Sequence, residues 1–179
     1  MNKRVEAKLS LLESTRLSLL EKLKTADIKK LNTSTAPGKW SVAQIIYHLN
    51  KAESNSVIYV SKKMKDVNNL KKSGLYERIK MLAVKIAFAL PFRYKAPAVL
   101  GDMPQDVDYN DIIVKWEETR KQLKELIASM PEEMLSLKVF KQPAAGRLDI
   151  YQMLNFMQSH FDRHLRQIEN ISRRYNGGF

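Results

Sequence analysis

The chain has 179 residues, of which 44% are apolar and 28% are charged, a balance typical of a compact globular protein and unlike that of a disordered chain. It contains no cysteine, which excludes a disulfide framework and any thiolate that could serve as a metal ligand or nucleophile. The net charge of +12 would suit a nucleic acid or an anionic membrane, but the basic residues are scattered and no nucleic-acid motif accompanies them. We therefore interpret the charge as a solvated basic surface and keep direct nucleic-acid binding as a less favoured alternative.

The ends and the apolar runs of the chain show no targeting or membrane-spanning pattern. The first residues, MNKRVEAKLSLLESTR, lack the unbroken apolar core of a signal peptide. The longest apolar run, residues 81–92, contains Lys85 and is too short to span a bilayer. We expect a cytoplasmic protein without a membrane partner, folded as one domain over residues 1–179.

Apolar residues recur at helical spacing in five stretches of the chain. The pattern predicts helices over residues 3–30, 42–64, 75–90, 111–130 and 149–173. Ser41 followed by Gln44 is a capping-box pattern at the start of the second helix, and Asp149 can cap the last. Four principal helices with a shorter one inserted predict an all-α fold, a helix bundle.

Two stretches between the helices carry signals of their own. Residues 92–108 contain Pro97, Gly101 and Pro104 and predict a long irregular connection, which could form a wall or lid over a site. Residues 137–141, LKVFK, favour a brief extended segment.

The chain has three histidines, and two of them form the pattern His160-x-x-x-His164. Side chains four residues apart lie one above the other on a helix, so both imidazoles can point at a single cation. We expect the fold to bring His48 against this pair to make a three-nitrogen site. Imidazole suits zinc, nickel, iron or copper, and three protein ligands leave room for water or substrate. Ordinary packing is the alternative for each histidine.

The helix that carries His48 also has a polar stripe. At about 100° per residue, Gln44, Asn55 and Tyr59 lie within roughly 40° of His48 and could line a cavity, bind substrate or orient a ligand. Glu53 lies about 140° round the helix, which argues against it as a general base. Arg163 and Gln167 lie near the ligands on the last helix and could serve in the same ways. Core hydrogen bonding is the alternative for each.

Two segments resemble the signature regions of the DinB-like (DinB/YfiT) superfamily. They are GKWSVAQIIYHL, residues 38–49, and GRLDIYQMLNFMQSHFDRHLRQI, residues 146–168. The family's metal-binding positions match the three histidines, and its flanking pattern matches four further residues: Trp40, Leu49, Gln167 and Ile168. The rest of the chain resembles the family in helix count and length.

The resemblance implies a four-helix bundle whose middle helices run parallel after a long crossover, together with a divalent metal, often nickel or zinc, and homodimerisation. It implies a metal-dependent hydrolase or a transferase of low-molecular-weight thiols, such as bacillithiol or mycothiol, acting on a small molecule. Here the thiol must be external, and we assign no catalytic group beyond a metal-bound water. A non-catalytic metal- or ligand-binding stress-response protein stays open as an alternative, and a nucleic-acid-associated basic protein is a more distant one.

Overall fold

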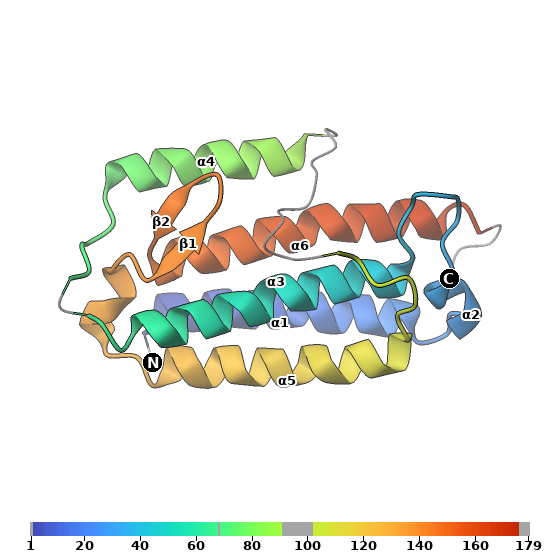
Figure 1. Cartoon of the computed structure of the whole chain (residues 1–179), viewed down its shortest axis with the longest axis horizontal. Coiled ribbons are helices and arrows are strands. Elements are labelled where there is room, and N and C mark those ends of the chain that lie inside the picture. The colour runs from blue at the N-terminus through green and yellow to red at the C-terminus, as the bar shows by residue number, and fades with distance from the viewer. Residues whose placement is uncertain (1, 68, 91–101, 176–179) are drawn as a thin grey trace.

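The computed structural model describes residues 2–67, 69–90 and 102–175, and its four longest helices lie side by side as a bundle (Figure 1). These helices are α1 (Lys3–Leu23), α3 (Val42–Lys63), α5 (Tyr109–Ala128) and α6 (Ile150–Ser172). In Figure 1, α3 and α5 run in one direction while α1 and α6 run in the other. The expected four-helix bundle with parallel middle helices is confirmed.

Because α3 and α5 are parallel neighbours, the chain needs a long connection between them. This connection contains the extra helix α4 (Leu75–Ala89). Helix α4 lies outside the bundle and packs against α6 (Figure 1). Of the irregular connection expected over residues 92–108, residues 92–101 lie outside the described part. The remainder leads into α5, where the Asp108 side chain caps the helix by accepting a hydrogen bond from the Asp111 N–H at 3.0 Å.

The first helix is shorter than predicted. It ends at Leu23 rather than continuing to residue 30, and a second short helix, α2 (Ile28–Asn32), follows. The Asp27 carboxylate accepts a hydrogen bond from the Lys29 N–H at 2.9 Å, which starts this new helix with its own cap. Apolar periodicity continues across the break, so the periodicity did not reveal the cap.

A small antiparallel hairpin precedes the last helix. Strand β1 (Phe140–Gln142) pairs with β2 (Gly146–Leu148), with Phe140 opposite Leu148. Gly146 has φ +80°, a conformation that glycine adopts without steric cost. The extended segment expected over residues 137–141 is found shifted toward the C-terminus, and its partner strand was not predicted. The hairpin packs against α3 and α4.

A buried charge network joins three helices of the bundle. Glu53 on α3 is 3% exposed and Arg120 on α5 is 7% exposed. The Arg120 Nε and Nη2 atoms donate to the two Glu53 carboxylate oxygens at 2.6 and 3.0 Å, and Trp116 Nε1 donates to Glu53 at 2.9 Å. Arg120 Nη1 donates to the Leu12 carbonyl of α1 at 2.9 Å. The carboxylate is therefore fully engaged in holding α3 against α5.

Candidate metal centre

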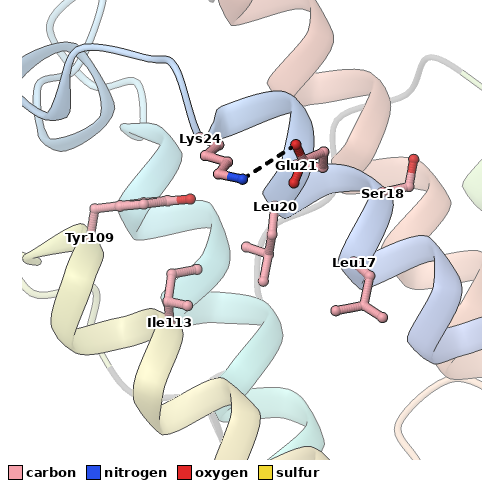
Figure 2. A pocket seen from close by; sticks show the side chains of 7 residues that line it. All are labelled: Leu17, Ser18, Leu20, Glu21, Lys24, Tyr109 and Ile113. Atoms are coloured by element: carbon pink, nitrogen blue, oxygen red, sulfur yellow. Dashed lines mark ion pairs between the residues drawn. The ribbon is translucent and has the colours of Figure 1, made fainter.

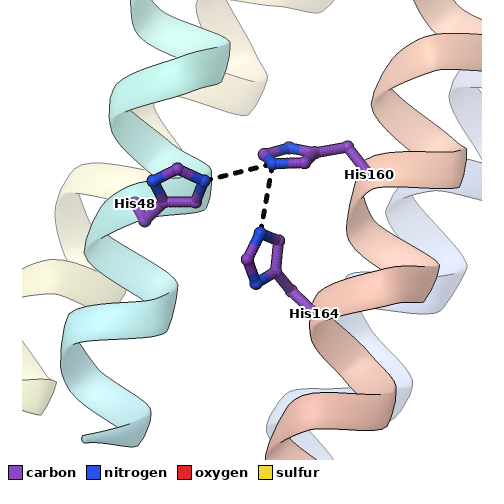
Figure 3. A group of neighbouring side chains, drawn as sticks. All are labelled: His48, His160 and His164. Carbon is purple, nitrogen blue, oxygen red and sulfur yellow. Dashed lines mark hydrogen bonds between the residues drawn. The ribbon is translucent and has the colours of Figure 1, made fainter. Parts of the chain in front are cut away.

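The three histidines meet between α3 and α6 (Figure 3). The Nε2 atom of His160 lies 3.1 Å from Nε2 of His48 and 3.1 Å from Nε2 of His164. One ring nitrogen from each residue falls within 4.8 Å of the other two. Two helices that are far apart in sequence thus direct three imidazoles at one point.

Local capping fixes the register of both helices. The Ser41 hydroxyl accepts from the Gln44 N–H at 3.1 Å, and the Gln44 side chain accepts from the Ser41 N–H at 2.9 Å. At the start of α6, Asp149 and Gln152 form the same reciprocal pair at 2.8 and 3.0 Å. These capping boxes set where each helix begins and so determine the face on which its histidines lie.

All three imidazoles are held neutral by their surroundings. Burial lowers the pKa of His48 from 6.5 to about 4. Burial, followed by the charge of His48, lowers the pKa of His164 to about 3. Burial and the two neighbouring imidazoles bring the pKa of His160 well below its ordinary value. At neutral pH each ring therefore has one nitrogen with a lone pair, which is the form that binds a metal.

Gln167 determines which nitrogen of His164 carries the proton. Its Oε1 atom lies 3.0 Å from His164 Nδ1, and a carbonyl oxygen can only accept, so the hydrogen bond places the proton on Nδ1. The Nε2 atom of the neutral ring then has its lone pair directed at His160. Gln167 thereby orients the ring and prepares Nε2 as a ligand.

Replacing Gln167 with alanine should weaken binding of a divalent cation by about 10–100-fold, because outer-shell partners of metal-bound histidines have effects of that size. Replacing it with glutamate should keep the affinity, since a carboxylate also accepts from Nδ1. Isothermal titration with zinc on chelator-treated protein would measure both. Equal affinity in the alanine variant and the unmodified protein would contradict this role.

Aromatic side chains surround the imidazoles. The Phe156 ring stacks on His160 with centroids 5.6 Å apart and an interplanar angle of 7°. Phe88 of α4 lies 5.7 Å from the same ring, and Trp40 lies 5.1 Å from His48. Phe156 stands four residues before His160, so helical spacing could have indicated it. Phe88 comes from a separate helix and has no signal in the sequence. Together the three rings limit the access of water.

Gln44, Asn55 and Tyr59, the polar stripe predicted beside His48, lie at different positions along α3. The Gln44 side chain caps α3 and donates to the Pro104 carbonyl at 2.7 Å, so it ties the connection before α5 to the start of α3. At 1.5 Å per residue, Asn55 and Tyr59 lie about 10 and 16 Å along α3 from His48. Their expected roles in binding substrate stay predictions.

Arg163 lies one turn from His160 and is engaged with the end of α4. Its Nη1 atom donates to the Leu90 carbonyl at 3.2 Å, and its guanidinium lies 5.9 Å from the centre of the Phe88 ring. Arg166 Nη2 donates to the Phe88 carbonyl at 2.8 Å. The two arginines thus fasten α4 beside the three imidazoles, and a role of Arg163 toward substrate stays a prediction.

A surface groove of about 680 Å³ lies elsewhere, between α1 and α5 (Figure 2). It is lined by aliphatic side chains such as Leu20 and Ile113 and by the pair formed by Lys24 and Glu21 at 3.6 Å. Both charged side chains are more than 70% exposed. The residues that line the groove include none of the histidines. It is open, and its two charged groups are exposed and paired with each other, so we do not assign it a site.

The buried imidazoles should make the metal-free protein less stable in mild acid. An ordinary histidine takes up a proton near pH 6.5, whereas burial lowers the pKa of His48 in the folded chain to about 4. Between these values the unfolded chain binds more protons, so the free energy of unfolding falls as the pH drops through this window and is unaffected by these groups above it. Urea unfolding in the presence of a chelator would measure this dependence. A His48→Asn variant should show a shallower slope, and an unchanged slope would contradict the assignment.

Comparison with known proteins agrees with the fold and shows the family. The model of the DinB superfamily matches residues 11–168. YuaE, an uncharacterised protein of Bacillus subtilis (strain 168), is 24% identical over 140 residues, which cover 78% of this chain and 82% of YuaE. The solved structure of YfiT from Bacillus subtilis superposes with a TM-score of 0.61 at 16% identity, covering 98% of this chain and 90% of YfiT. YfiT is described as a probable metal-dependent hydrolase with an unusual four-helix bundle topology. The chain described here belongs to the DinB superfamily.

Proposed function

We propose that this protein is a metal-dependent enzyme whose divalent cation is held by His48, His160 and His164. The observation that carries the proposal is the convergence of three neutral Nε2 atoms, with His160 only 3.1 Å from each of the other two. Each neutral imidazole keeps one N–H, which can lie on either ring nitrogen. The lowered pKa values of these histidines disfavour a second proton on each ring, so every ring offers a lone pair to a cation when its N–H lies on Nδ1, and the donor set fits a cation.

The chemistry of the donors indicates which cations suit the site. Among the described residues, the cluster contains only imidazoles, without a carboxylate, and the chain has no cysteine. Nickel and zinc both accept imidazole nitrogen readily, whereas magnesium and calcium prefer oxygen. Among the transition metals that suit imidazole, we propose nickel or zinc, the two that the family resemblance implies. A cation held by three imidazoles supplies Lewis acidity, which lowers the pKa of water or a thiol and polarises a carbonyl.

The surrounding side chains have supporting roles. Gln167 orients His164, and Trp40, Phe88 and Phe156 form an apolar surround that strengthens electrostatic interactions within it. Glu53 is committed to Arg120 and Trp116, so it is not available as a general base. We assign no protein side chain to proton transfer.

We propose that the reaction is hydrolysis of a small molecule or transfer of a low-molecular-weight thiol to an electrophile. The description of YfiT as a probable metal-dependent hydrolase supports the first. Thiol transfer would need an external thiol, since the chain has no cysteine. Both reactions need a coordination position that the protein leaves open, which distinguishes them from a closed structural site.

An open position can be tested with cobalt(II), whose visible absorption responds to its ligands. Protein loaded with cobalt should change its spectrum when a small anion such as azide, or a low-molecular-weight thiol, is added. The Gln167→Glu variant is the matched control, because it keeps the three ligands. A spectrum that neither azide nor thiol alters would indicate a closed site and would contradict the enzymatic proposal. A response to thiol alone would favour the transferase reaction over hydrolysis.

A further inference from the structure

Helix α4 carries a row of exposed aliphatic side chains that the bundle does not use. Its inner side packs on the protein through Met81, Val84 and Phe88, of which Met81 is 6% and Val84 9% exposed. At about 100° per residue the outward side chains fall within roughly 80° of one another and form one straight ridge. We call this row the α4 ridge: Leu75 (71% exposed), Ile79 (59%), Leu82 (57%), Ile86 (54%) and Leu90 (42%).

Cations flank the α4 ridge on both sides. Arg78 and Lys85 follow one edge, both exposed, and Lys80 lies on the other, with its ammonium 4.3 Å from the centre of the Tyr76 ring. The helix has a single carboxylate, Glu77, which turns inward to accept from the Gly74 N–H at 2.8 Å and to pair with Lys138. The outward face therefore combines apolar and positive groups only.

Neighbouring elements extend the same positive charge. Burial, followed by the charges of Arg4 and Lys85, lowers the pKa of Lys8 on α1, so the charge of Lys8 is coupled to that of Lys85 on α4. At its C-terminal end α4 is held by Arg163 and Arg166, which donate to its last carbonyls. Like charges gathered round an apolar ridge repel one another, and an anionic surface would relieve that repulsion.

We propose that α4 is an interfacial anchor that lays its ridge into the headgroup region of an anionic lipid bilayer. An amphipathic helix with aliphatic residues on one face and lysine or arginine along its edges has the composition that such binding requires. A second copy of the chain would bring cations against cations, and a nucleic acid would leave the aliphatic ridge in water.

We expected no membrane partner because the sequence has no apolar segment long enough to span a bilayer. None of the helices in the described part is long and apolar enough to cross a bilayer, and an interfacial helix needs no such length.

The anchor would place the metal centre close to the membrane surface. Phe88 of α4 packs on His160, and the ridge ends at Leu90, whose carbonyl accepts from Arg163. Helix α4 therefore carries the ridge on its outer side and contacts the imidazole cluster through Phe88 on its inner side. The proposal does not depend on the reaction that the metal centre performs.

Sedimentation with lipid vesicles tests the proposal directly. The purified chain of 179 residues should sediment with vesicles that contain equal shares of phosphatidylcholine and phosphatidylglycerol. It should sediment at least about tenfold less with phosphatidylcholine alone, since each basic residue near an anionic surface contributes on the order of a factor of five. Added salt should weaken binding because it screens the charges.

Paired variants separate the contribution of the ridge from that of the charges. I79S/L82S should lower partitioning at least about tenfold, because two aliphatic side chains no longer enter the interface. L11S/V114S, which changes two aliphatic residues on α1 and α5 that are likewise more than half exposed, should leave it unchanged. R78Q/K85Q should lower binding roughly 25-fold, whereas K115Q/K121Q, with the same loss of charge on α5, should have a much smaller effect. All four positions of the serine variants are exposed, so circular dichroism should show intact folds.

Three outcomes would overturn the proposal. The first is no sedimentation of the unmodified protein with anionic vesicles at low salt. The second is equal binding by I79S/L82S and the unmodified protein. The third is a lipid-free dimer, measured by analytical ultracentrifugation, that I79S/L82S dissociates, because the α4 ridge would then be a surface for self-association.

Discussion

Replacing Glu53 with alanine should lower the free energy of unfolding by about 3–5 kcal/mol, the range expected when one member of a buried ion pair is removed. The variant leaves the Arg120 guanidinium, which is 7% exposed, without the carboxylate that accepts two of its hydrogen bonds. Trp116 Nε1 also loses its acceptor. Urea denaturation followed by circular dichroism would measure the change.

Two further variants make this result specific. Glu125→Ala removes an exposed carboxylate from α5 and should change stability by no more than about 0.5 kcal/mol. A double variant, Glu53→Leu with Arg120→Met, removes both charges and should recover part of the loss, because no unpaired charge is then buried. If Glu53→Ala is no less stable than Glu125→Ala, the pair does not hold α3 against α5 as described.

Replacing His160 with alanine should weaken binding of zinc or nickel by more than the roughly 100-fold that marks the upper effect of an outer-shell partner. His160 is the central member of the cluster, since its Nε2 atom lies 3.1 Å from both of the other Nε2 atoms. Its loss leaves two imidazoles on separate helices. Competition with a coloured chelator would measure the affinity.

The matched control for His160→Ala is Ser159→Ala on the same helix. Ser159 donates to the Asn155 carbonyl, one turn earlier, and is not part of the cluster. Its replacement should leave metal affinity unchanged and alter helix stability only slightly. Equal affinities in the His160 and Ser159 variants would mean that the metal, if bound, is held elsewhere.

The sequence predicted the helices well where capping residues mark their ends. The pattern of Ser41 and Gln44 predicted the start of α3, and Asp149 predicted the start of α6. Apolar periodicity alone failed between Leu23 and Ile28, where the carboxylate of Asp27 begins a new helix. The strand β2 was missed because Gly146–Leu148 is too short to show an alternating pattern and depends on its pairing with β1.

The part of the candidate site that lies on a single helix could be predicted from the sequence. Helical spacing brings His160 and His164 together, whereas the approach of His48 depends on how α3 packs on α6, so the family resemblance was needed to support it. Tertiary packing also brings Phe88 to His160. Glu53 could be separated from the site by its angle round α3, but its partner Arg120 lies on a different helix and left no sign in the sequence.

Elemental analysis of the untagged protein tests the metal centre most directly, because a polyhistidine tag would itself bind metal. We expect about one equivalent of nickel or zinc per chain in the unmodified protein, in line with a single three-imidazole cluster. We expect none in a variant in which His48, His160 and His164 are all alanine. The same metal content in that triple variant, or no metal in unmodified protein supplied with both ions, would contradict it.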